Sequence, residues 1–364
     1  MLLLALPIII LCLGTCFPPK DKNQHRANTY IFLFLCCLAV TLFVGLRSRH
    51  VGSLDTNAYA GFFEGVRNAS LFSTLKNSEI TNFREFLTGE GMFTLLMCGT
   101  AQVFSNAQIF IFITSLIITI CTGIFIHKHS DDPLFSWIAY ICLGLMTFNM
   151  KGMRQALAMA ICLLAYGFAK RRQFVRFLLI VLLAFMFHRT AFVFLIVYPL
   201  CNYKPSLIKN TIFVSLSGTF LIFSRQIAAI YDSWAGKDYA SGESFDGGGF
   251  TVVSIYILLL VLSALYIHYS DKDHPERDNI TALSTLLIVG FIFYISRYLS
   301  TQIFERASYY FFYFSILLFP KLSNTFDKES RPLYKMIAIV LAVVLFGYRL
   351  IGGPMSNYIF FWQA

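Results

Sequence analysis

Apolar runs of about 17 to 20 residues recur along this chain from one end to the other. An α-helix of that length crosses the hydrocarbon core of a bilayer, which is about 30 Å thick. Only 13% of the residues are charged, whereas soluble domains carry about a quarter. We therefore predict an all-α polytopic membrane protein in which residues 1–364 form a single transmembrane domain.

The apolar runs predict about twelve transmembrane helices. They lie at 1–17, 29–46, 107–126, 134–150, 152–169, 173–187, 189–201, 207–224, 250–268, 280–296, 307–320 and 333–350. The segment 90–105 is shorter and more polar, so we expect a half-inserted or interfacial helix there. The N-terminal run has no basic region before it and no small-residue cleavage site, and is interpreted as the first span.

The basic run KRRQFVR at 170–176 is the strongest topology signal, because Lys and Arg accumulate in cytoplasmic loops. Placing it inside puts both chain termini outside, together with the outer-side loops 47–106 and 225–249. The loops that then lie inside are 18–28, 127–133, 202–206, 269–279 and 321–332. The pattern thus predicts one end of the helical bundle that faces the cytoplasm and one that faces away from it.

This topology separates the two kinds of basic residue. Ten arginines and three lysines lie outside, whereas ten lysines and six arginines lie inside. Lysine suffices as a topology signal, but the planar fork of arginine binds phosphate oxygens through two hydrogen bonds. Seven outer arginines stand at predicted helix mouths: Arg47, Arg154, Arg189, Arg225, Arg297, Arg306 and Arg349. They indicate a shared anionic ligand at the outer leaflet, with pairing to acids or to lipid phosphate as the alternative.

The composition excludes several classes of function. The basic residues are scattered between the spans and form no soluble stripe, so we expect no nucleic-acid partner. The nine cysteines lie within or at the edges of apolar segments, without a CxxC pair or a His/Cys cluster. No DxD motif lies on the outer side. The sequence therefore predicts neither a metal nor another cofactor.

Short polar motifs interrupt the apolar runs on the predicted outer side. They are RSRHVGSLDTNAY at 47–59, EGMFTLL at 90–96, MKGMRQALAMAI at 150–161, FMFHRTAFVFLIVYP at 185–199 and ERASYYFFYFSILLFP at 305–320. Their order resembles the EpsG family of Wzy-like bacterial polysaccharide polymerases, and the likeness spans residues 47 to 320. MRQALAMAI and FHRTAF, at this spacing, are its most specific parts.

The resemblance implies a GT-C-like membrane glycosyltransferase in the bacterial plasma membrane, with its active site facing the periplasm or the cell exterior. The implied substrate is a polyprenyl-pyrophosphate-linked oligosaccharide. The growing glycan would pass from undecaprenyl pyrophosphate to the sugar of another lipid-linked repeat unit. Membrane lipid is a further expected partner, and other polysaccharide-assembly proteins, such as a flippase or a chain-length regulator, are candidates.

That chemistry needs a general base for the acceptor hydroxyl and positive charge for the leaving pyrophosphate. The candidate bases are Asp55, Glu90 and His188. Asp55 is alternatively a helix N-cap or turn residue, Glu90 an N-cap or an arginine partner, and His188 a helix cap. The candidate substrate-binding residues are Arg47, Lys151, Arg154, Arg189, Trp234, Tyr239, Arg297 and Arg306.

Three of these arginines carry the main hypothesis for the donor. We expect Arg154, Arg189 and Arg306 to converge on its pyrophosphate. Lys151 and Arg154 thus serve as ligands at one end of the span 152–169, whereas the basic run 170–176 sets topology at the other. In the loop 231–250, Trp234 and Tyr239 are expected to stack on sugar faces.

Other functions remain open from the sequence. An O-antigen-ligase-like glycosyltransferase uses the same lipid donor with another acceptor. A membrane O-acyltransferase also uses a histidine at the membrane. A flippase for lipid-linked oligosaccharides is less compatible, because the sequence has no internal repeat and its charges gather at one face.

Overall fold

The computed structural model describes residues 2–19, 26–51, 54–67, 69, 73–74, 85–86, 90–235, 249–271, 274, 276–299, 302–351, 353 and 355–364. These residues form helices and one isolated β-bridge, between Arg47 and Phe360, and no strand. The first helices are η1 (Leu2–Leu4), α1 (Ala5–Cys16), α2 (Arg26–Gly45), α3 (Leu54–Val66), α6 (Gly91–Val103), α7 (Ala107–His129), α8 (Pro133–Cys142), α9 (Leu145–Lys151), α10 (Met153–Lys170) and α11 (Phe174–Phe185). The others are η2 (Arg189–Ile196), α12 (Val197–Leu200), α13 (Leu207–Ile222), α14 (Ser224–Ala235), α15 (Gly249–Tyr269), α16 (Arg277–Leu299), α17 (Gln302–Phe312), α18 (Ser315–Ser323), α19 (Arg331–Leu350) and η3 (Phe361–Gln363).

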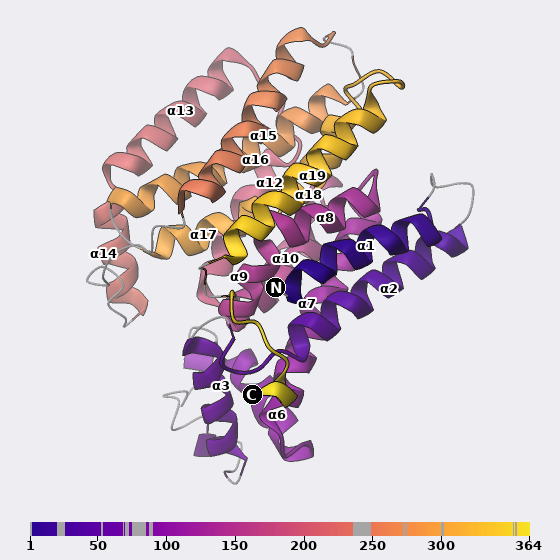
Figure 1. The fold of residues 1–364 in the computed structure, drawn as a ribbon. Helices are drawn as coiled ribbons and strands as arrows, with labels where there is room; N and C mark the ends of the chain where they lie inside the picture. The colour runs from indigo at the N-terminus through magenta and orange to yellow at the C-terminus, as the bar shows by residue number, and fades with distance from the viewer. Residues whose placement is uncertain are drawn as a thin grey trace.

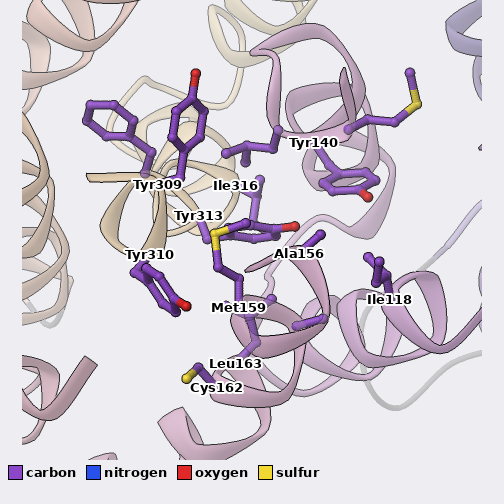
Figure 2. Packing of buried hydrophobic residues seen from close by; sticks show 14 of the residues in the cluster. Ile118, Tyr140, Ala156, Met159, Cys162, Leu163, Tyr309, Tyr310, Tyr313 and Ile316 are labelled. Atoms are coloured by element: carbon purple, nitrogen blue, oxygen red, sulfur yellow. The ribbon is translucent and has the colours of Figure 1, made fainter. Parts of the chain in front are cut away.

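Helix α10 is the central element of the bundle. Fourteen of its 18 residues are buried, because alanines and a glycine alternate with larger apolar residues and let neighbouring helices approach closely. It packs against α7 and α11 along its length and against η2 and α9 at its start. In Figure 2, Met159 of α10 lies close to Tyr313, which follows α17, and Ile118 of α7 and Tyr140 of α8 belong to the same core.

Every predicted span coincides with a helix or with two consecutive helices. The predicted span 134–150 is broken into α8 and α9, which meet at an angle of 50°. The predicted span 307–320 is likewise split between α17 and α18, and the span 189–201 begins as a 3₁₀ helix. Breaks of this kind expose backbone groups inside a bundle, and such groups are tolerated where they line a cavity.

Four of the described helices are long and apolar enough to cross a membrane: α2, α7, α16 and α19. The number rises to six when the bent pairs α8–α9 and α13–α14 each count as one span. The chain is therefore a helical membrane protein. The total of twelve spans and the GT-C-like arrangement stay predictions.

The segment predicted to be half-inserted forms helix α6. Its 13 residues would span about 20 Å, which is less than the hydrocarbon core of a bilayer. Figure 1 shows α6 and α3 together at one end of the molecule, beyond the ends of α2 and α7, with the C-terminus beside them. The second predicted outer loop, 225–249, differs from expectation because it begins as a helix, α14.

The loops predicted to face the cytoplasm are joined to each other by ion pairs. Lys321 donates to Asp131 at 2.6 Å and to Glu276 at 2.9 Å, which connects three of these loops. Lys204 lies 2.7 Å from Asp278 and so connects a fourth. The predicted cytoplasmic loops at 127–133, 202–206, 269–279 and 321–332 thus gather at one end of the bundle.

Candidate functional site

A cavity of about 490 Å³ lies between α3, α9, α10, α17 and the end of α19. Fifteen described residues line it: Asp55, Tyr59, Glu90, Gly144, Thr147, Phe148, Lys151, Gly152, Arg154, Gln155, His188, Glu305, Arg306, Tyr309 and Arg349. All five motifs that the sequence singled out on the outer side contribute to them, and Gly144, Thr147, Phe148 and Arg349 lie outside the motifs. Six predicted site residues, namely Asp55, Glu90, Lys151, Arg154, His188 and Arg306, therefore meet at one place.

Glu90 and Arg154 form a closely bonded charged pair in the cavity. Nη1 of Arg154 lies 2.6 Å from Oε2 of Glu90, and its Nε donates to the hydroxyl of Tyr59 at 3.0 Å. The guanidinium also lies over the rings of Tyr59 and Phe93, at 5.2 and 5.7 Å from their centroids. Arg154 is thus held by an anion, a phenol and two aromatic faces.

His188 faces the second oxygen of the same carboxylate. Its Nε2 lies 3.6 Å from Oε1 of Glu90, while its Nδ1 accepts from the backbone N–H of Thr190. In a neutral imidazole with Nδ1 as acceptor, the proton sits on Nε2 and points towards Glu90. His188 therefore caps η2, as one interpretation of the sequence proposed, and its ring lies beside the carboxylate.

The backbone brings Glu90 and His188 together from distant parts of the chain. The N–H of Met92, in the first turn of α6, donates to the carbonyl of Met186 at 3.2 Å. Glu90 itself has φ of 63°, a left-handed conformation that is uncommon for residues other than glycine. Such strained residues cluster at functional sites, where the surrounding contacts hold them. The side chain of Glu90 makes no cap hydrogen bond to α6.

The opposite wall of the cavity is built on α9, α17 and α19. Lys151 ends α9, Arg306 lies in the first half of α17, and Arg349 lies in the last turn of α19. Nε2 of Gln155, one residue after Arg154, donates to the carbonyl of Arg306 at 2.5 Å. The Arg-Gln pair of the motif thus fastens α10 to both walls.

Glu305 lines the cavity and pairs with Arg297, which stands behind it. Nη1 of Arg297 lies 2.9 Å from Oε1 of Glu305 and donates to the hydroxyl of Tyr294. Burial raises the pKa of Glu305, and the positive charges of Arg297, Lys151 and Arg306 oppose this rise. Arg297 is therefore a partner of a cavity residue and does not line the cavity itself.

Arg47 was expected to bind substrate, but the structure gives it another position. Its side chain is fully buried, it does not line the cavity, and it donates to the backbone carbonyls of Val44 and Met150, the latter at 3.0 Å. Burial lowers the pKa of this guanidinium to about 10. Arg47 thus holds the residue that precedes Lys151, because an internal arginine must bond to acceptors inside the protein.

Three further predicted ligands are Arg189, Trp234 and Tyr239. Arg189 is the first residue of η2 and is not among the described residues that line the cavity. Trp234 lies in α14, but its side chain falls outside what the structure describes, as does all of Tyr239. Among the described residues no cluster of three or more His, Cys, Asp or Glu side chains is arranged for a metal ion.

Several lining residues were not selected from the sequence, although signals for some were present. Tyr59 follows Asp55 by four residues, which places both on one face of α3. Glu305 and Tyr309 are likewise four residues apart on α17, one on each side of the predicted Arg306 in the sequence. Arg349 was one of the arginines at predicted helix mouths, but no neighbouring motif distinguished it.

Positively charged side chains outnumber negatively charged ones in the lining of the cavity. Lys151, Arg154, Arg306 and Arg349 face Asp55, Glu90 and Glu305, and Arg297 neutralises the last of these from outside the lining. A surplus of positive charge therefore remains beside a buried carboxylate–histidine pair. This combination suits a reaction in which an anion leaves and a hydroxyl loses its proton.

A family model now supplies the comparison with known proteins. The EpsG family model matches residues 30–361 of the 364. This chain belongs to the EpsG family. The matched range contains every residue that lines the cavity, and it extends past the C-terminal helix, which the motifs alone did not cover.

Other comparisons add no further relatives. No curated protein and no solved structure matches the chain. Family membership and the apolar helices together support a membrane protein of polysaccharide biosynthesis.

Proposed function

We propose that this EpsG-family protein is a polysaccharide polymerase that uses lipid-linked substrates at the outer face of the bacterial plasma membrane. The observation that carries the proposal is the pairing of Glu90 with His188 and Arg154 in a cavity that also holds Lys151 and Arg306. A base and several cations at one cavity are what glycosyl transfer from a pyrophosphate donor requires.

The proposed reaction joins two lipid-linked glycans. The acceptor sugar hydroxyl attacks the anomeric carbon of the growing glycan, a new glycosidic C–O bond forms, and the bond to the pyrophosphate oxygen breaks. Undecaprenyl pyrophosphate leaves with the bonding electron pair, and the hydroxyl proton passes to the protein. No nucleotide sugar is consumed, because the donor is already activated by its pyrophosphate.

Glu90 is the proposed proton acceptor. Its Oε2 accepts from Nη1 of Arg154 at 2.6 Å, and its Oε1 lies 3.6 Å from Nε2 of His188, which is a further candidate base. Each carboxylate oxygen accepts more than one hydrogen bond, which leaves room for the acceptor hydroxyl beside His188 and Arg154. Asp55 lines the same cavity and is another candidate base.

Aromatic side chains offer surfaces for the sugars. Phe148 and Tyr309 stack with their ring centroids 3.7 Å apart, and both line the cavity. Tyr59 adds a third ring on the wall that carries Glu90. Aromatic rings have apolar faces, and pyranose rings stack on them through their C–H bonds.

Purified protein supplied with one defined lipid-linked repeat unit tests the function. The polymerase predicts a ladder of products with rising repeat number, without any nucleotide sugar. A single transfer to a different acceptor would identify a ligase, acyl transfer from an acyl donor an acyltransferase, and lipid translocation without a new bond a flippase. Each of these three results contradicts the proposal.

A further inference from the structure

Arg349 lies against a glycine whose conformation is unusual. Gly144 connects α8 to α9 and has φ of +96°. A Cβ atom at this position would lie 2.3 Å from Nη1 and 2.6 Å from Nη2 of Arg349, which no real contact allows. The glycine therefore permits both the bend between the two helices and the close approach of the guanidinium to the backbone.

One nitrogen of the Arg349 guanidinium has no hydrogen-bond partner in the described part of the chain. This atom, Nη1, is buried, although Arg349 lines the cavity. A buried donor without a partner costs about 1 to 3 kcal/mol and more when it is charged. Buried donors without a partner are rare for that reason, and one that faces a cavity is a place where a ligand can complete the site.

Arg154 cannot supply the same function, because its Nε and Nη1 already bond to Tyr59 and Glu90. The cations on the other wall are Lys151, Arg306 and Arg349, which come from three different helices. A diphosphate carries several negative oxygens and can contact cations from more than one direction.

We propose that Arg349, seated on Gly144, forms with Lys151 and Arg306 the subsite for the diphosphate of the donor. This inference rests on the proposed function and deepens it, because it moves the diphosphate away from Arg154 and Arg189. Arg154 becomes a positioning residue for Glu90. The donor then enters with its diphosphate on the α9–α17–α19 wall and its reacting carbon towards Glu90.

Binding of inorganic pyrophosphate to the purified full-length protein, measured by titration calorimetry, tests the subsite without any need for turnover. The variant Arg349→Gln should weaken binding by about tenfold or more, as expected for a lost hydrogen bond to a charged group. Arg349→Lys keeps the positive charge but not the planar guanidinium, so its affinity for pyrophosphate should lie between those of the wild type and Arg349→Gln. Arg49→Gln is the matched control, because Arg49 is exposed at the same end of the bundle and does not line the cavity.

The variant Gly144→Ala tests the same subsite without changing any of its three basic residues. Its methyl group must displace the guanidinium, so pyrophosphate binding should fall while residue 349 remains arginine. If Arg349→Gln does not fold, Arg349→Lys still decides, because unchanged affinity in this variant would overturn the subsite. Unchanged affinity in Arg349→Gln would do the same.

Failure of the subsite and failure of the proposed function give different results. In the elongation assay, Arg349→Gln should raise KM for the lipid-linked donor more than it lowers kcat. A protein that elongates glycans but binds pyrophosphate without Arg349 contradicts the subsite alone. A protein that binds pyrophosphate through Arg349 but makes no ladder supports the subsite and contradicts the polymerase.

Discussion

At the scale of single residues, the structure gives Arg154 partners that bear on its proposed role. The sequence marked it as a ligand for pyrophosphate because it stands at a helix mouth beside Lys151. Its contacts with Glu90 and Tyr59 are the basis of our proposal that it holds the carboxylate in place. Its charge and its position at a helix mouth predicted that Arg154 belongs to the site. Its partners Tyr59 and Glu90 could not be predicted, because they depend on how α3 and the start of α6 pack against α10.

We predict that Arg154→Lys lowers the elongation rate by about 10- to 100-fold, although the charge is kept. A single ammonium group cannot bond to Glu90 and Tyr59 from two edges while stacking on Phe93. The measurement is the rate of ladder growth on equal amounts of inserted protein. The control is Arg171→Lys at the other end of α10, which should behave as the wild type, and near-normal elongation by Arg154→Lys would contradict the role.

A second residue-scale prediction concerns the hydroxyl group at position 190. Oγ1 of Thr190 lies 2.7 Å from Nδ1 of His188 and 3.2 Å from the hydroxyl of Tyr310. Thr190→Val keeps the shape but removes the hydroxyl, so the imidazole loses an anchor and elongation should fall by about tenfold. Thr190→Ser restores the hydroxyl and should be close to the wild type. Equal rates for the two variants would show that this hydroxyl does not position His188.

At the scale of helices, hydropathy predicted where each apolar span lies but not how the span is broken. The apolar run at 134–150 has no sequence signal strong enough to show that Gly144 turns left-handed and bends the segment by 50°. A glycine within an apolar run is usual in membrane helices, so only the packing against Arg349 reveals its purpose. The 3₁₀ geometry after His188 was missed for a similar reason, since apolar periodicity does not distinguish it from an α-helix.

Arg47 illustrates the same limit at the ends of elements. Its buried side chain bonds to the end of α2 and to the end of α9. Its backbone forms the β-bridge with Phe360 of the C-terminal segment, so Arg47 connects all three. From sequence, an arginine at a helix mouth cannot be assigned to backbone acceptors or to a ligand. The C-terminal residues that surround it were predicted only as an outer tail.

We predict that Arg47→Met lowers the free energy of unfolding by about 3 kcal/mol, because the methionine fills the space but leaves buried carbonyl groups without donors. Thermal unfolding in detergent measures the change. Arg49→Met, two residues later and exposed, should change stability by no more than about 0.5 kcal/mol. Equal melting temperatures for these two variants would contradict the fastening role of Arg47.

At the scale of the whole molecule, the two ends of α10 belong to different environments. Lys151 and Arg154 lie in the cavity, whereas Lys170 donates to the carbonyl of Cys201 and to the side chain of Asn279. Because basic clusters at both ends of one span cannot both be cytoplasmic, the sequence predicts that the Lys170 end faces the cytoplasm and the cavity faces away from it.

We predict that a cysteine at Glu64 is labelled by an impermeant reagent added to intact cells, and that one at Lys328 is labelled only after permeabilisation. Both positions are exposed, at opposite ends of the bundle. The background is a variant in which the exposed Cys12 and Cys16 are replaced. Labelling in the reverse pattern would place the cavity on the cytoplasmic side. The third informative position, Lys76, lies outside the described residues.

The central claim is that Glu90 accepts the proton of the acceptor sugar inside this cavity, and the initial elongation rate of Glu90→Gln tests it most directly. With a defined lipid-linked repeat unit, the account predicts a fall of about 10²- to 10⁴-fold, as expected for loss of a general base. Glu64→Gln, an exposed carboxylate on the neighbouring helix α3, should elongate at the rate of the wild type. A Glu90→Gln protein that is inserted at normal levels and still builds the ladder at a rate near that of the wild type would contradict the account.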